Sequence, residues 1–208
     1  MLTLYSMQGT CALAVHISLE WAQIPYQLNL LNSDDNHQLE YLQVNPLGSV
    51  PAMELPDGSV LTEASALLTY IDAERPNRFA APSRDSLGKA RLAETLSFFT
   101  TELHAAFAPH FAPARFHPDK AEHATLKSQA YTRLQRLFDF TDDSMIGPYV
   151  FGLDRSVADP YLYVLTRWIA GTPLSLDSFP LLSGFKDRME MDNSVRKVLK
   201  SYDINVMA

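Results

Sequence analysis

The pattern of apolar residues changes character once along the chain, near residue 80. Before that point, short strand-like runs alternate with helical patterns in the order β-α-β-α-β-β-α. Such an alternation predicts a mixed sheet covered by helices. After that point we find only helical periodicity, in long patterns at Ser86–Phe107, Pro118–Phe140, Ser156–Ile169 and Phe179–Met191. The chain is therefore predicted to fold into an α/β part followed by an all-α part.

A polar, proline-bearing stretch, Glu74–Asp85, separates the two parts and is typical of a linker. We assign residues 1–77 to the first domain, 78–85 to the linker and 86–208 to the helical domain. In the first domain, strands are expected at Leu2–Ser6, Tyr26–Leu30, Pro51–Leu55 and Val60–Thr62, and helices at Ala12–Ala22 and Glu63–Asp72. Asp57-Gly58 predicts the hairpin turn between the last two strands.

The composition excludes several classes of protein. The formal net charge of −7 argues against a nucleic-acid binder, which needs a basic face. One cysteine cannot form an internal disulfide, no secretory signal is recognised, and no apolar run approaches the roughly 18 residues of a membrane span. We expect a cytoplasmic protein without a membrane partner. Six scattered histidines and one cysteine give no metal-ligand spacing, so no metal site is expected.

The single cysteine, Cys11, is predicted at or next to the start of a helix, after the turn Met7–Thr10. Helix N-termini carry unpaired N–H groups and a partial positive charge, and both favour the reactive thiolate. Cys11 is therefore expected to have a lowered pKa and a chemical role. The alternative is a buried cysteine that acts as a small hydrophobe.

Two further segments have the chemistry of a ligand site. Pro51 belongs at a strand start, an edge or a cis turn. If Pro51 is cis, the backbone groups of Val50 face outward and could pair with a peptide-like ligand, whereas a trans proline at a strand start would be purely structural. In Leu61–Leu67, the first N–H groups of a helix could hold a carboxylate and Glu63 could pair with an ammonium group. The alternative is an ordinary cap with an acidic first turn.

Two features of the helical part also stand out in the sequence. Ser156–Asp159 has the pattern of a capping box, with Asp in place of the more usual Glu, and Pro160 follows within the first turn. This pattern predicts the start of a buried helix. His104, alone on a long helix, is by itself only a polar residue at a partly exposed position.

Together these motifs resemble the cytosolic glutathione S-transferase family, and within it the bacterial beta class. The matching segments occur in family order across nearly the whole chain: Gly9–Cys11, Asn45–Ala52, Asp57-Gly58 with Leu61–Glu63, Thr101–His104, and Ser156–Asp159. The resemblance implies a thioredoxin-like N-terminal domain, a helical C-terminal domain, a homodimer, and glutathione as co-substrate.

The resemblance also implies roles for individual residues. Cys11 and His104 would face the glutathione sulfur, and the Val50 backbone, before a cis Pro51, would pair with its cysteinyl part. Glu63 would bind the γ-glutamyl group, beside the N–H groups that open its helix. The remaining positions expected to contact glutathione are Ala64 and Ser65 at that helix start, and Ser97, Thr101 and Glu102 on the segment that reaches glutathione in this class.

The chain departs from the family pattern at several positions. Ser6 stands where the class usually has a tyrosine, and Tyr5 is not expected to replace it because neighbouring strand residues face opposite sides. Ala64 and Ser97 replace a serine and an asparagine. The loop Asn32–Gln38 has no lysine for the glycine carboxylate, and His37 is a possible substitute. These departures predict weaker or altered glutathione binding.

The leading functional hypothesis is conjugation of the glutathione thiolate to hydrophobic electrophiles. The electrophile would lie between the domains, with Phe107, Phe111, Tyr161 and Trp168 as candidate walls, although aromatic residues at helical spacing are more often core. A second hypothesis uses Cys11 as the nucleophile in disulfide exchange or reductive dehalogenation. Thr10 is a further candidate, because other classes use a hydroxyl near this turn. The third hypothesis is a non-catalytic binding module.

Overall fold

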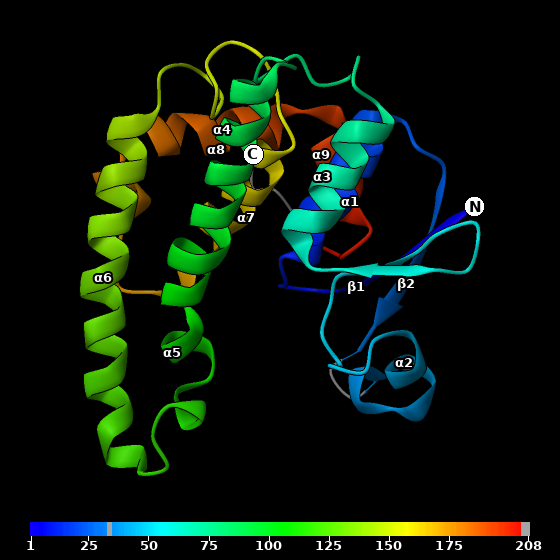
Figure 1. The fold of residues 1–208 in the computed structure, drawn as a ribbon. Coiled ribbons are helices and arrows are strands. Elements are labelled where there is room, and N and C mark those ends of the chain that lie inside the picture. Colours follow the sequence, from blue (N-terminus) through cyan, green and yellow to red (C-terminus); the bar gives the residue numbers. More distant parts are fainter. Residues whose placement is uncertain (33–34, 205–208) are drawn as a thin grey trace.

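The computed structural model describes residues 1–32 and 35–204 (Figure 1). Its sheet consists of β1 (Leu2–Met7), β2 (Tyr26–Leu31), β3 (Ala52–Glu54) and β4 (Val60–Thr62), in the spatial order β2-β1-β3-β4. β1 pairs in parallel with β2 and antiparallel with β3, and β3 pairs antiparallel with β4. This is the mixed four-stranded sheet of a thioredoxin-like domain, as predicted.

Helices cover both faces of this sheet. α1 (Ala12–Ala22) and α3 (Ala64–Glu74) lie together on one face, and the short α2 (Leu39–Val44) lies on the other (Figure 1). Every residue of α1 except Glu20 is buried. A helix that is buried all round must be covered on more than one side. The sheet and α3 cover one side of α1, and α7 and α9 of the helical part cover another.

In the described residues of the second part, every regular element is a helix, which confirms the predicted fold class. Its α-helices are α4 (Ser86–Phe98), α5 (Ala108–Phe111), α6 (His123–Ser144), α7 (Ala158–Trp168), α8 (Pro180–Met191) and α9 (Asn193–Lys200). Short 3₁₀ turns lie in the same part at Pro113–Arg115, Lys120–Glu122, Ile169–Gly171 and Leu176–Ser178, and one lies in the first part at Asp35–His37. None of the helices in the described residues is both long and apolar enough to cross a bilayer.

The helix predicted at Ser86–Phe107 differs from the observed one in a way that matters for the site. α4 ends at Phe98 and continues as a π-helical segment, Phe99–His104. A π-helical turn shifts the register in which later side chains leave the helix axis. The side chains of this segment therefore face directions that α-helical periodicity does not predict.

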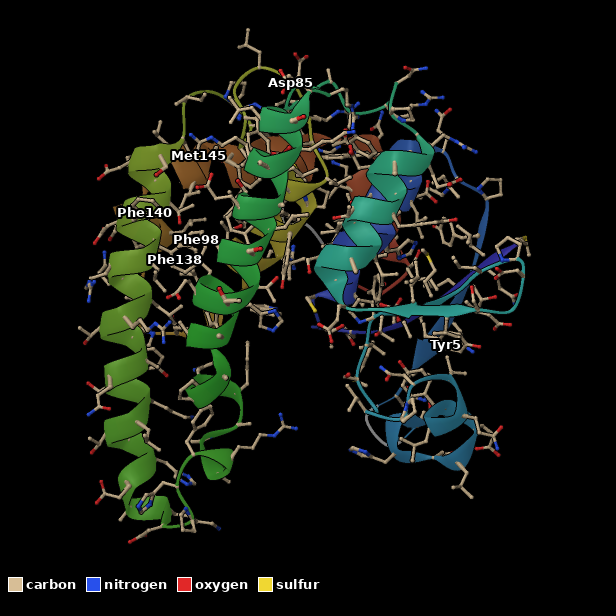
Figure 2. The ribbon with its side chains drawn as sticks, viewed as in Figure 1. Tyr5, Asp85, Phe98, Phe138, Phe140 and Met145 are labelled. Atoms are coloured by element: carbon tan, nitrogen blue, oxygen red, sulfur yellow. The ribbon has the colours of Figure 1, made fainter. Side chains whose placement is uncertain are left out.

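Aromatic contacts hold the helices of the second part together. The Phe98 ring at the end of α4 meets the Phe140 ring of α6 edge to face, with the ring centroids 5.4 Å apart (Figure 2).

The predicted capping box is present at the start of α7. Asp159 Oδ2 accepts hydrogen bonds from the Ser156 N–H at 2.6 Å and the Ser156 hydroxyl at 2.9 Å. α7 is buried from Ala158 to Thr166 and joins the core of both parts.

Candidate active site

A cavity of about 420 Å³ lies between the two parts of the chain. Its lining comes from the β1–α1 turn, the segment before β3, the start of α3, the π-helical segment, and α5 and α7. The residues are Gly9, Thr10, Cys11, Ser49, Val50, Pro51, Glu63, Ala64, Thr100, His104, Phe111, Tyr161 and Trp168. Residues that are distant in the sequence and were singled out separately are thus brought into one site.

Cys11 directly precedes α1, as predicted, but its thiol is not activated. The side chain is only 8% exposed, and Sγ lies 4.0 Å from the Val50 carbonyl oxygen. The pKa of Cys11 is raised to about 12, mainly by burial and to a smaller extent by the Glu63 carboxylate, and a backbone hydrogen bond opposes this rise only in part. The expected lowering of the pKa is therefore wrong. Cys11 presents a neutral S–H at neutral pH.

The turn before Cys11 depends on a glycine and on Thr10. Gly9 has φ = +79°, a conformation that glycine adopts without strain. The Thr10 hydroxyl donates a 2.7 Å hydrogen bond to the Met7 carbonyl and so closes the turn. Because that proton is used within the turn, the Thr10 hydroxyl cannot also donate to a sulfur atom while the bond persists.

The segment before β3 supplies backbone groups to the cavity. The Val50–Pro51 peptide bond is cis, as the family resemblance implies. Asn45 and Tyr41 hold the approach to this bond, since both donate hydrogen bonds to the Ser49 carbonyl, at 2.7 and 2.6 Å. Ser49, which sequence reasoning did not single out, also lines the cavity.

Glu63 is an unpaired acid at the edge of the cavity. It directly precedes α3, which begins at Ala64 rather than at Glu63 as predicted. Its φ of +69° is strained for a non-glycine residue and costs on the order of 1–3 kcal/mol. Within the described residues its carboxylate has no hydrogen bond or ion pair, so it is available to a cationic group. Ala64 lines the cavity beside it, whereas Ser65 does not.

His104 reaches the cavity from the end of the π-helical segment. Its Nδ1 lies 2.9 Å from the Tyr161 hydroxyl oxygen, and its ring meets Trp168 edge to face at 4.8 Å. Desolvation lowers the pKa of His104, so the ring is neutral at neutral pH. Trp168 in turn donates a 3.0 Å hydrogen bond from Nε1 to the Gly9 carbonyl. The histidine and the Cys11 turn are thus held in one arrangement across the two parts.

The aromatic wall differs from the predicted one at one position. Phe111, Tyr161 and Trp168 line the cavity, but Phe107 does not. Phe107 is fully buried and packs between Phe138 and Trp168, with ring centroids 6.0 and 5.4 Å away. Phe107 therefore supports the wall from the core and cannot contact an electrophile in this cavity.

The polar residues expected to contact glutathione from this part of the chain lie away from the cavity, Ser97 on α4 and Thr101 and Glu102 on the π-helical segment. Thr100 lines it instead of Thr101, and no sequence signal distinguishes the two. Ser97 and Thr101 are exposed and bond to one another, the Thr101 hydroxyl donating to the Ser97 carbonyl. Glu102 forms an ion pair with Arg133 at 2.6 Å. None of these three side chains lines the cavity.

Apart from Ala64, the described positions where the chain departs from the family pattern lie outside the cavity lining. The Ser6 side chain is fully buried, with its hydroxyl 2.6 Å from that of Tyr202. Tyr5 lies on the opposite face of the sheet, near α2, with its ring 5.5 Å from that of Tyr41 (Figure 2). Neither can substitute for a tyrosine in the cavity. His37 is exposed and does not line it.

The charge distribution limits the chemistry of the site. Among the described residues that line the cavity, Glu63 is the only acidic side chain and none is a lysine or an arginine. The described residues also contain no group of three or more His, Cys, Asp or Glu side chains arranged to hold a metal ion. An anion in this cavity would be stabilised by neutral hydrogen-bond donors and by the start of α1.

The structure combines a thioredoxin-like sheet, an all-helical second part and a cavity between them. This combination defines a class of protein that is found among known structures. Residues 9–74 match the family model "Glutathione S-transferase, N-terminal domain". The glutathione S-transferase GstA of Escherichia coli O157:H7 is 30% identical over 206 residues, covering 95% of this chain and 97% of that protein. This chain therefore belongs to the glutathione S-transferase family.

Solved structures agree with this assignment. A glutathione transferase homologue from Sulfitobacter, with bound glutathione, is 31% identical, with a TM-score of 0.89 over 97% of this chain and 98% of that one. The beta-class enzyme of Sphingomonas chungbukensis is 30% identical, with a TM-score of 0.83 over 98% and 100% of the two chains. The predicted similarity to the bacterial beta class is confirmed.

Proposed function

We propose that this chain binds glutathione in the cavity between its two parts and conjugates it, through its sulfur, to hydrophobic electrophiles. The observation that carries the proposal is the composition of that cavity. It places an unpaired carboxylate, Glu63, and the backbone of Val50 on one side, and the aromatic rings of Phe111 and Trp168 on the other. Glutathione requires a polar half that can bind a peptide, and a hydrophobic electrophile requires an apolar half.

The polar half fits a tripeptide with a free amino group. The Glu63 carboxylate would pair with the γ-glutamyl ammonium group, and the N–H groups that open α3, beginning at Ala64, would bind the carboxylate beside it. Val50 would pair through its backbone with the cysteinyl part, in the manner of an added strand. The glutathione sulfur would then lie near Cys11 and His104.

Catalysis would consist of ionising and aligning the thiol. The bound thiol loses its proton to solvent, the sulfur lone pair forms the bond to the electrophilic carbon, and the leaving group departs as an anion. The start of α1 and the His104 side chain would stabilise the sulfur anion. Cys11 would lie beside the sulfur as a neutral thiol whose S–H points to the Val50 carbonyl.

The state of Cys11 distinguishes this reaction from its enzymatic alternative. In disulfide exchange or reductive dehalogenation, the Cys11 thiolate would itself be the nucleophile. With a pKa of about 12 it is almost wholly protonated at neutral pH. Conjugation by glutathione does not need that ionisation, so the structure supports conjugation better.

The proposal is tested by calorimetric titration with glutathione, followed by conjugation of an activated aryl halide. Glu63→Gln should weaken glutathione binding by roughly tenfold, because a charge-assisted contact to the ammonium group is lost. Glu94→Gln is the matched control: Glu94 is exposed, pairs with Arg91 on α4 and lies outside this cavity. Equal affinities of the two variants for glutathione would show that Glu63 does not contribute to glutathione binding.

A stronger contradiction would come from the unmodified protein. The third hypothesis, a non-catalytic binding module, predicts neither heat of binding at millimolar glutathione nor turnover of the aryl halide. That combined result would overturn the proposed function.

We also propose that the protein acts in the cytoplasm as a homodimer, as its family resemblance implies. Its single cysteine is consistent with a reducing compartment. Light scattering after size-exclusion chromatography should give twice the 23.3 kDa mass of the chain.

A further inference from the structure

The His104 ring is fixed by two contacts that leave one ring nitrogen free. Tyr161 lies 2.9 Å from Nδ1, and Trp168 packs against the ring. No other described residue forms a hydrogen bond with the His104 side chain, so Nε2 has no partner among the described residues. Among the described residues, Asp72 Oδ1 is the only fully buried side-chain nitrogen or oxygen without a hydrogen bond. Nε2 of His104 also lacks a hydrogen bond but is not among these atoms, so it is not fully buried. Because His104 lines the cavity, Nε2 is accessible from it.

The bond to Tyr161 can be made in two ways, with different chemical consequences. If Nδ1 carries the proton, Nε2 presents a lone pair to the cavity and can accept a thiol proton. If the Tyr161 hydroxyl donates to Nδ1, the ring proton lies on Nε2, which then donates into the cavity. The hydrogen bond at one ring nitrogen thus decides the chemistry of the other.

The second arrangement is favoured by the chemistry of the two groups. A phenol O–H is a stronger donor than a neutral imidazole N–H, and an imidazole nitrogen is a stronger acceptor than a phenol oxygen. Burial raises the pKa of Tyr161 and lowers that of His104. Both groups are therefore neutral at neutral pH, and the proton order follows their intrinsic strengths.

We propose that Tyr161 is a positioning residue whose hydroxyl holds His104 as the Nε2–H tautomer, so that His104 donates a hydrogen bond to the substrate sulfur rather than accepting its proton. This inference rests on the proposed function for the identity of the sulfur. It gives His104 a defined task in a cavity whose described lining residues include the acid Glu63 and no lysine or arginine. A thiolate there needs neutral donors, and Tyr161 keeps one of them aimed inward.

The tautomer is measured directly by ¹⁵N NMR of the histidine side chains, assigned with His104→Gln. Neutral imidazole has one protonated and one unprotonated nitrogen, with well separated shifts, so the spectrum identifies the tautomer without substrate. The unmodified protein should show His104 protonated at Nε2. A His104 protonated at Nδ1 would overturn the proposal, whether or not any Tyr161 variant folds.

The functional test is the pH profile of kcat/KM for Tyr161→Phe. Without the Tyr161 hydroxyl, Nδ1 carries the ring proton in a fraction of the molecules. In that fraction Nε2 is unprotonated and donates no hydrogen bond to the thiolate. Activity should fall roughly 2- to 10-fold near pH 6.5, and the deficit should narrow toward pH 9, where the thiol ionises without help. Glutathione affinity by calorimetry should change little, because Tyr161 acts on the sulfur and not on the tripeptide ends.

Tyr163→Phe is the matched control. Tyr163 is also buried on α7, but its hydroxyl bonds to Glu190 and Arg167 and it does not line the cavity. It should leave the His104 tautomer and the shape of the pH profile unchanged. If Tyr161→Phe behaves like Tyr163→Phe in both measurements while the unmodified protein conjugates glutathione, Tyr161 has no positioning role. If the unmodified protein does not bind glutathione, the proposed function fails, and the NMR result alone decides the tautomer.

Discussion

The protonation of Cys11 is decided by two opposing effects at a single residue. A helix N-terminus stabilises a nearby anion by about 0.3–1 kcal/mol at the surface and up to about 2 kcal/mol when partly buried. A rise of the pKa from 9.0 to about 12 corresponds to about 4 kcal/mol against ionisation. Desolvation therefore outweighs the helix start, and position in the sequence does not by itself predict a reactive cysteine.

The reaction of Cys11 with iodoacetamide tests this balance. Only the thiolate reacts, so the labelling rate of the folded protein should rise about tenfold per pH unit from pH 7 to pH 10 without reaching a plateau. The unfolded chain in urea is the control, and its rate should level off above about pH 8.5. A plateau below pH 9 in the folded protein would show that the thiol is not desolvated as described.

At the residue scale, sequence reasoning found part of the site from motifs and part of it, Phe111, Tyr161 and Trp168, from single aromatic residues. Val50, Glu63 and His104 were placed by family resemblance, and all three line the cavity. Phe107 was expected there as well, because burial behind a wall and exposure within it leave the same aromatic pattern in the sequence. Thr100 was missed because its exposure depends on the π-helical register, which apolar periodicity does not encode.

At the scale of elements, helix starts were more predictable than helix ends. The Ser156–Asp159 box was recognised because both capping partners lie within four residues of sequence. α9 was missed, although Asp192 caps its first N–H groups and its buried residues Val195, Val198 and Leu199 follow helical spacing. That signal could have identified the helix. The π-helical segment had no such local signal.

The capping box should contribute measurably to stability. The Ser156 side chain is fully buried; its hydroxyl donates to Asp159 at 2.9 Å and accepts from the Ala158 N–H at 3.2 Å. Ser156→Ala removes both bonds and should lower the unfolding free energy by about 1–2 kcal/mol. Urea denaturation followed by circular dichroism measures this loss.

Ser144→Ala is the control for that experiment. The Ser144 side chain is exposed at the end of α6 and bonds only to the Phe140 carbonyl of its own helix. Its replacement should change the unfolding free energy by less than about 0.5 kcal/mol. Equal effects of the two substitutions on the unfolding free energy would mean that the capping box at the start of α7 contributes no more to stability than an exposed serine hydroxyl.

At the scale of the whole molecule, a chain of hydrogen bonds with a buried centre joins the sheet to the C-terminal helices. His16 of α1 is its centre: Nδ1 lies 3.1 Å from the Tyr202 hydroxyl and Nε2 lies 2.5 Å from the Tyr26 hydroxyl. Tyr202 continues to Ser6 on β1, and Tyr26 donates to Glu20, which pairs with Lys197 of α9. Neither end of this chain was predictable from sequence, because its members are up to 196 positions apart.

This chain of hydrogen bonds should make stability depend on pH in a defined direction. Burial lowers the pKa of His16 to about 4 from an ordinary value of 6.5. The unfolded chain therefore binds more protons than the folded one between pH 4 and 6.5, so the His16 contribution is complete above about pH 6.5 and is lost as the pH falls to 4. The loss amounts to about 3 kcal/mol. Asp159, whose pKa burial raises to about 6, has the opposite effect between about pH 4 and 6.

Because these two groups oppose one another, the wild-type curve alone does not isolate His16. His16→Gln keeps a polar side chain that cannot be protonated, and it leaves Asp159 unchanged. The difference in unfolding free energy between the wild type and His16→Gln should therefore shift by up to about 3 kcal/mol in favour of the variant from pH 7 to pH 4. Urea denaturation at each pH, followed by fluorescence of the two tryptophans, measures it. A difference that stays constant over this range would mean that His16 titrates normally in the folded protein, and that the hydrogen-bonded chain does not hold it neutral between the two parts of the molecule.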